Sequence, residues 1–188
     1  GVAQALRHAV RRLFADDLNG AIDALAPAVA EEPEGADLLL RRGVLLREAG
    51  HWAEARAALE RVVALEPGRA PAWRELGIVL DREGDDGAEA ALRRAVTISS
   101  DYRALVSLGF LQSRRGEGAD ALGLLERALS ASEGHLNLVL PVAVLRAAHA
   151  GHTTLDPLER ARLEEVLTIR GAQAGLDGGG PPEDAPWS

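Results

Sequence analysis

Apolar and polar positions alternate along the chain with the period of amphipathic helices, and the arrangement returns about every 34 residues. A small residue is followed four positions later by a leucine, and three positions after that by a small or branched apolar residue. This triplet first occurs at Ala21, Leu25 and Ala28, and it begins again at residues 55, 88 and 121, in steps of 34, 33 and 33. The pattern predicts the second helix of a repeated helix-turn-helix unit.

Small residues also recur in the first helix of each unit and in the turn that follows it. In the first helices they are Gly43, Gly77, Gly109 and Ala143, and in the turns they are Gly50, Gly84 and Gly116. Small residues at helical spacing let neighbouring helices approach closely, and a turn glycine adopts backbone conformations that other residues avoid. Pro33 and Pro67, 34 residues apart, are expected to end the second helix of the first two units.

These signals divide the chain into an all-α domain of stacked repeats, residues 1–170, and a tail, residues 171–188. The repeats are predicted at 2–35, 36–69, 70–101 and 102–135, with a degenerate capping repeat at 136–170. In this last repeat Asp156 is the expected N-cap of a helix that has Pro157 at its first position. The tail is rich in Gly, Pro and acids, which is typical of a linker or a disordered segment.

The repeats resemble the tetratricopeptide repeat family. The segment "WRELGIVL", residues 73–80, is similar to the family's W-x2-L-G-x2-Y, and "AEARAALERVVALEP", residues 53–67, to its A-x3-F…P, with Leu80 and Leu59 in place of the aromatic residues. The resemblance covers residues 2–135 and implies a right-handed superhelical solenoid. It also implies that the first helix of each repeat lines a concave surface.

Composition limits the function classes. The formal net charge is −8, and all 21 basic residues are arginines, so a nucleic-acid backbone or an anionic membrane is not the expected main partner. Cysteine is absent, which excludes disulfides and thiolate chemistry. No apolar run approaches the roughly 18 residues of a membrane span.

No catalytic or metal-binding motif stands out, so we expect no enzyme activity, cofactor or metal. His149 and His152 are three residues apart with His135 upstream, but Gly151 interrupts the helix on which a ligand pair would lie. Adjacent carboxylates, at residues 85–86 and 164–165, are interpreted as a turn and a solvated helix face. Trp52 and Trp73 are expected in the core and Trp187 in the tail without a role.

The concave-face residues follow from the resemblance. Positions five and nine of the repeats are apolar in nine of ten cases, and Arg7, Arg41, Arg103 and Arg114 flank them. We predict a partner-binding stripe in which each pair of positions lies on one helical face. Its residues are Leu6, Arg7, Val10, Leu40, Arg41, Val44, Arg74, Ile78, Arg103, Val106, Phe110, Arg114, Leu140 and Val144.

An apolar groove with an arginine rim suits another protein or a peptide segment, either an amphipathic helix or an extended segment with acidic flanks. The chain is therefore predicted to be a protein-interaction scaffold or adaptor, with a cytoplasmic location. Two alternatives remain open at this stage. The repeats could self-assemble into a homo-oligomer, or they could be a regulatory or recruitment domain of a larger enzyme. The absence of an initiator Met and the "GGGPP" segment keep the latter alternative open.

Overall fold

A computed structural model describes residues 1–99 and 101–131, and within these ranges every regular element is an α-helix. The helices are α1 (Val2–Phe14), α2 (Leu18–Glu31), α3 (Ala36–Glu48), α4 (Trp52–Leu65), α5 (Ala70–Glu83), α6 (Gly87–Ile98), α7 (Tyr102–Arg114) and α8 (Gly118–Ala131). The chain divides into two compact units, residues 1–111 and residues 112–188. The first holds α1 to α6 and most of α7, and the described part of the second holds the end of α7 and α8.

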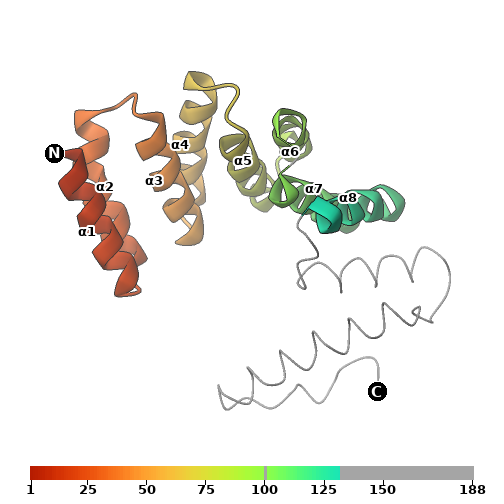
Figure 1. Cartoon of the computed structure of the whole chain (residues 1–188), viewed down its shortest axis with the longest axis horizontal. Helices are drawn as coiled ribbons and strands as arrows, with labels where there is room; N and C mark the ends of the chain where they lie inside the picture. Colours follow the sequence, from red (N-terminus) through yellow and green to blue (C-terminus); the bar gives the residue numbers. More distant parts are fainter. Residues whose placement is uncertain (100, 132–188) are drawn as a thin grey trace, which may run out of the picture. The chain divides into compact units, whose positions relative to one another are not determined.

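The first unit is a series of antiparallel helix pairs, α1 with α2, α3 with α4 and α5 with α6 (Figure 1). Consecutive pairs are joined through the second helix of one and the first helix of the next, since α2 packs on α3 and α4 packs on α5. This is the arrangement expected of a repeat protein, in which each unit buries its apolar face against its neighbours.

The core consists of the residues that repeat in the sequence. All twelve anchor positions in the second helices have at most 1 % of their surface exposed: Ala21, Leu25, Ala28, Ala55, Leu59, Val62, Ala88, Leu92, Ala95, Ala121, Leu125 and Ala128. The repeat pattern is therefore a core pattern. Burying a leucine of this kind contributes about 2 kcal/mol.

Close contact between paired helices explains the glycines of the first helices. A Cβ atom at Gly77 would lie 2.6 Å from Cγ of Leu92, and one at Gly43 would lie 3.0 Å from Cγ of Leu59. Both leucines are fully buried, so the glycine is what lets the two helices approach.

The turns inside the repeats share one backbone geometry. Gly50, Gly84 and Gly116 have φ of 81°, 73° and 83°, which confirms that the turn requires a left-handed residue. The amide that follows each donates to the carbonyl five residues earlier, as in the bond from Asp85 N to Leu80 O of 2.8 Å. In the first repeat Asp16 occupies this position with φ of 55°, so this turn has no glycine to mark it in the sequence.

Helix ends follow the proline signals in the first two repeats, because α2 and α4 stop two residues before Pro33 and Pro67. Pro27 is an exception, since it lies inside α2 on an exposed position. The degenerate repeat 136–170 and the tail 171–188 lie outside the described residues. None of the described helices is long and apolar enough to span a bilayer.

Candidate functional site

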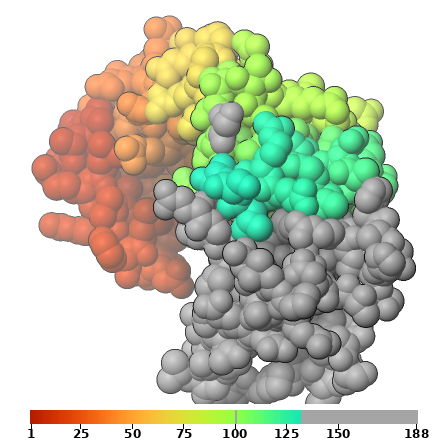
Figure 2. Space-filling model, turned by 45° about the vertical axis from the view of Figure 1, so that its right-hand side comes forward, coloured from red at the N-terminus to blue at the C-terminus, as the bar shows by residue number. Residues whose placement is uncertain are grey.

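The candidate site is a groove between α1 and α3, the first helices of the first two pairs. No Cα atom of α1 comes within 8 Å of one in α3, whereas α3 and α5 do approach that closely. The wider separation leaves a cavity of about 370 Å³. The residues that line it are Leu6, Ala9, Val10, Leu13, Leu25, Asp37, Leu40, Arg41, Val44, Leu45 and Arg69. The first two helix pairs are coloured from red through orange toward yellow in the space-filling view (Figure 2).

Five of the predicted stripe residues meet in this groove: Leu6, Val10, Leu40, Arg41 and Val44. None of the four apolar ones belongs to the closed core, because each is half-buried or exposed, and Val10 has 49 % of its surface exposed. Amphipathic spacing places them on one side of their helices, away from the second helices that form the core. The groove is therefore lined by apolar side chains that solvent reaches.

An ion pair between Arg69 and Asp37 forms part of the groove lining. Arg69, from the segment before α5, bonds to the carboxylate of Asp37 at the start of α3, and also to Glu66 at 2.7 Å. The hydrogen bond from Arg69 lowers the pKa of Asp37, and the bond to Asp37 raises the pKa of Arg69. Asp37 is therefore held as an anion that is already neutralised by a cation.

Arg41 is the groove's second arginine, and its positive charge also helps to lower the pKa of Asp37. Its side chain is exposed and, among the described residues, it forms no ion pair within 4.0 Å. Arg7, on α1, is likewise exposed and unpaired in this part of the chain. Both predicted rim arginines of the first two repeats are thus available to an anionic group.

Arg74 has a different environment from the one predicted. It occupies the position in α5 that Leu40 holds in α3, but its side chain is only 15 % exposed and bonds to Glu75 at 2.6 Å and to Asp101 at 3.1 Å. Glu75, with 6 % of its side chain exposed, also accepts from Nε of Arg47 at 2.8 Å. Arg74 is therefore a member of a buried ionic network and is not a free groove residue.

The remaining described stripe residues lie outside the α1–α3 groove. Ile78 in α5 and Val106 in α7 are half-buried, and Phe110 is 37 % exposed. Arg103 is exposed and stacks over the ring of Tyr102, with 5.5 Å between guanidinium carbon and ring centroid. Arg114 is exposed and belongs to the second unit, and Leu140 and Val144 lie outside the described residues.

Six of the eleven residues that line the groove were not in the predicted stripe: Ala9, Leu13, Leu25, Asp37, Leu45 and Arg69. Leu13 has a sequence signal, because it follows Val10 by three positions on α1. Asp37 and Arg69 are 32 residues apart, and no pattern links them before the fold is known. Phe14 was also missed, although it is the most exposed large apolar side chain of the described chain, at 90 %.

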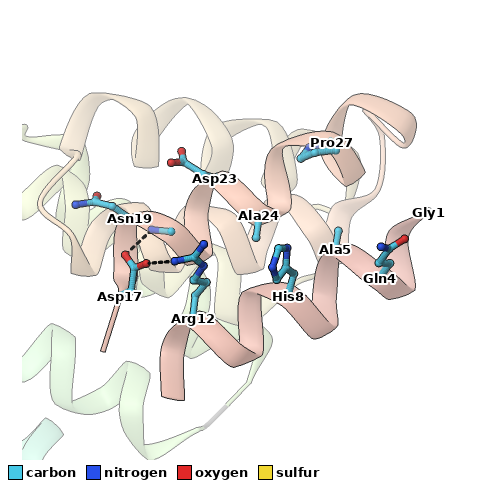
Figure 3. A pocket seen from close by; sticks show the side chains of 11 residues that line it. Gly1, Gln4, Ala5, His8, Arg12, Asp17, Asn19, Asp23, Ala24 and Pro27 are labelled. Atoms are coloured by element: carbon cyan, nitrogen blue, oxygen red, sulfur yellow. Dashed lines mark hydrogen bonds and ion pairs between the residues drawn. The ribbon is translucent and has the colours of Figure 1, made fainter. Parts of the chain in front are cut away.

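A second, shallower cavity of about 720 Å³ lies on the outer face of the first pair, between α1 and α2 (Figure 3). His8 and Arg12 extend from α1 toward α2, and Arg12 bonds to Asp17 at 3.0 Å. Asp17 also caps α2 by accepting from the amide of Gly20 at 2.8 Å. The polar groups at this surface therefore stabilise the turn between the two helices.

Comparison with α3 explains the polarity of this outer face. Buried leucines of α3 at positions 38 and 46 correspond, 34 residues earlier, to Gln4 and Arg12. At these positions α1 thus has polar and charged side chains in place of the large apolar side chains of α3.

The other candidate residues have structural partners. His51 precedes α4 and lies 3.1 Å from the Asn19 side chain. Trp52 and Trp73 are half-buried and lie at the edge of the core: Trp73 donates its indole N–H to Pro67 O at 2.9 Å, and Arg82 stacks on Trp52 at 5.6 Å. Within residues 1–99 and 101–131, no cluster of His, Asp and Glu could hold a metal ion. The three histidines considered as ligands lie outside these ranges.

Comparisons with known proteins agree with the helix-pair architecture. The family model described as "Tetratricopeptide repeat" matches residues 14–77, which include α2, α3, α4 and the start of α5. No curated protein sequence matches the chain.

Similar solved structures include MamA from Desulfovibrio magneticus, with a TM-score of 0.72 and 17 % identity over 92 % of this chain and 96 % of that one. A thermophilic repeat protein of the same type from Thermus thermophilus has a TM-score of 0.63 and 23 % identity over 73 % and 77 % of the two chains. An O-GlcNAc transferase mutant from Thermobaculum terrenum has a TM-score of 0.59 and 26 % identity, over 67 % of this chain and 26 % of the transferase. These likenesses confirm the predicted all-α solenoid fold class.

Proposed function

The chain is a tetratricopeptide-repeat protein, and on that premise we propose that it is a scaffold that binds a segment of another protein in the groove lined by the first helices of its repeats. The family and the fold support protein binding in general, and the groove supplies a location for it. No catalytic step forms part of this proposal.

One observation carries the proposal: exposed apolar side chains from two helices converge on one cavity beside an unpaired arginine. When a partner covers apolar side chains that were in contact with solvent, the free energy falls by about 25 cal/mol for each Å². The groove holds a cavity of about 370 Å³, room for a few large side chains. Arg41 then provides a charge that discriminates among partners.

The groove's polar groups suit binding better than chemistry. Arginine remains protonated at physiological pH, so Arg41 and Arg69 cannot act as general bases. Asp37 is paired with Arg69, which lowers its pKa, and a carboxylate of this kind is a poor proton donor near pH 7. A role in positioning a partner needs no proton transfer.

The test is capture of partner proteins by the immobilised full chain, followed by mass spectrometry. Val44→Glu places a charge in the groove, and the exposed Leu65→Glu on α4 is the matched control. We expect the parent and the control to retain the same set of proteins and Val44→Glu to lose it, with the helical circular-dichroism signal unchanged. Equal capture by both variants would contradict the groove, and no specific capture by the parent would contradict the scaffold.

A second candidate is a recruitment domain within a longer enzyme. It is favoured by the likeness to the transferase, of which the matched part is only 26 %. The reading frame that surrounds the coding segment tests it, since an adjoining catalytic domain is expected under this candidate alone.

A further inference from the structure

We infer that the occupant of the α1–α3 groove is an acidic amphipathic helix, and that Arg7, Arg11 and Phe14 of α1 extend its contact beyond the cavity. The inference rests on the proposed function, because it specifies the partner of the same groove. Three independent features of the described chain carry it: the charge of α1, the spacing of its exposed side chains and the point at which the apolar groove ends.

The charge of α1 is opposite to that of the rest of the chain. The first 15 residues contain three arginines and no acidic residue, whereas the remaining 173 contain 18 arginines and all 29 acidic residues. Arg12 is paired with Asp17, but Arg7 and Arg11 have no ion-pair partner among the described residues. Since Arg41 on α3 also forms no ion pair within that part of the chain, both α1 and α3 carry exposed arginines that attract an acidic segment.

The exposed side chains of α1 form a straight ridge. Arg7, Val10, Arg11 and Phe14 follow at intervals of three, one and three residues, which places them on one face of the helix. Val10 is 49 % exposed and Phe14 is 90 % exposed. From Arg7 to Phe14 the helix rises about 10 Å, or two turns. A second helix lying along the groove presents apolar side chains at the same spacing and length, whereas an extended strand does not.

The ionic network at α5 limits the groove to α1 and α3. At the position where α3 presents Leu40, α5 presents Arg74, whose charge is balanced by Glu75 and Asp101. Because Glu75 is buried and bound to two arginines, the network offers neither an apolar surface nor a free charge to a ligand. The partner's apolar anchors are therefore expected to contact α1 and α3 alone.

An anionic membrane would also attract arginines, but the shape of the groove favours a helix. The apolar residues Leu40 and Val44 line a recess between two helices. A flat bilayer surface cannot fill such a recess, whereas the side chains of a helix can.

The experiment titrates the full chain into a fluorescent peptide and follows anisotropy. The probe is an alanine-rich helical peptide of about 14 residues, with leucines at i, i+3, i+4 and i+7 flanked by glutamates. One control peptide has lysine in place of every glutamate, and another has a central proline that prevents the helix. Vesicles containing phosphatidylserine form the last arm.

Matched variants of the protein assign the contacts. Arg7→Glu with Arg11→Glu reverses charge on α1, and Arg61→Glu with Arg94→Glu makes the same change at exposed positions of α4 and α6. We expect the α1 pair to weaken binding of the glutamate peptide roughly tenfold and the control pair to leave it within about twofold. The tenfold effect is expected to shrink at about 0.5 M salt, because exposed charges are then screened. Phe14→Ser is expected to weaken binding severalfold, against no change for Leu65→Ser.

Four results would overturn the inference: equal binding of the lysine and glutamate peptides, equal binding of the proline peptide, equal effects of the two arginine pairs, or binding to the vesicles without binding to the peptide. These results are separate from a failure of the proposed function. If Val44→Glu abolishes capture of cellular proteins while the peptide does not bind, the groove stands and the acidic helix is wrong. If Val44→Glu changes neither, the groove itself is wrong.

Discussion

Gly77→Ala is expected to destabilise the protein, although alanine is the better helix former. The added Cβ would lie 2.6 Å from Cγ and 2.8 Å from Cδ2 of Leu92, and 3.2 Å from the carbonyl oxygen of Ala88. Cγ is the branch point of a leucine with 1 % exposure, so it cannot swing aside as the end of a flexible chain could. The helices α5 and α6 must therefore move apart.

Two opposing terms set the size of the effect. Replacing glycine by alanine inside a helix gains about 1 kcal/mol. Overpacking a close-packed core costs about 1–3 kcal/mol, and a contact this short with a rigid neighbour lies near the upper end. The net loss is about 1–2 kcal/mol, which lowers the melting temperature of a chain of this size by about 3–6 °C.

Thermal unfolding followed by far-UV circular dichroism measures the shift, with Gly123→Ala as the control. A Cβ at Gly123, in α8, would meet no atom of the described residues within 4 Å, so this identical change is expected to stabilise the protein or leave it unaltered. Leu92→Ala should cost less in the Gly77→Ala background than alone, because it removes the colliding atoms. A melting temperature for Gly77→Ala at or above that of the parent, or a Leu92→Ala effect independent of residue 77, would refute the close-approach argument.

Three further predictions follow from the ionic and hydrogen-bonded contacts. Glu75→Ala leaves Arg47 and Arg74, both largely buried, without their shared acceptor and should lower the free energy of unfolding by about 3 kcal/mol. A guanidinium denaturation curve with the parent's midpoint and slope would contradict this expectation. The pKa of Asp85 is lowered by the amide of Gly87 and by Arg56, so its contribution is present above the unfolded pKa and lost as pH falls through the folded value. Asp85→Asn should therefore lose less unfolding free energy than the parent as the pH falls into the acid range. An equally steep loss in the variant and the parent would contradict this role. Trp73→Phe removes the bond to Pro67 and should cost about 1 kcal/mol in the same denaturation assay, whereas an unchanged midpoint would show that water replaces the bond.

Local sequence signals predicted the helix pairs because each repeat forms through interactions close in the chain. Ala55, Leu59 and Val62 recur at helical spacing, and a residue with this spacing must face the core in every unit where it appears. The turn glycines were predictable for the same reason, since a left-handed backbone restricts the residue type. The left-handed turn at Asp16 was not predicted, because the expected signal was a glycine and aspartate also tolerates that conformation.

The candidate site was predicted in part. Periodicity placed Val10, Leu40 and Val44 on the first helices, away from the core positions. It did not place Arg74, which was expected at a groove-facing position equivalent to that of Leu40, because a guanidinium group pairs with the carboxylates that the fold brings near it. Here those carboxylates are Glu75, the adjacent residue, and Asp101, 27 residues away.

The sequence by itself determined which residues form helices, which of them face the core and that the units repeat, since these properties depend on spacing along one chain segment. Only the tertiary structure decided how far α1 lies from α3, and therefore that a cavity is present between these two helices. It also decided that the next first helix, α5, carries buried ion pairs instead of an apolar groove surface. The distance between first helices depends on the side chains packed between successive repeats. The pairing of Asp37 with Arg69 depends on how close the start of α3 lies to the segment before α5. Both properties result from contacts between residues about one repeat apart, so the sequence of a single repeat does not determine them.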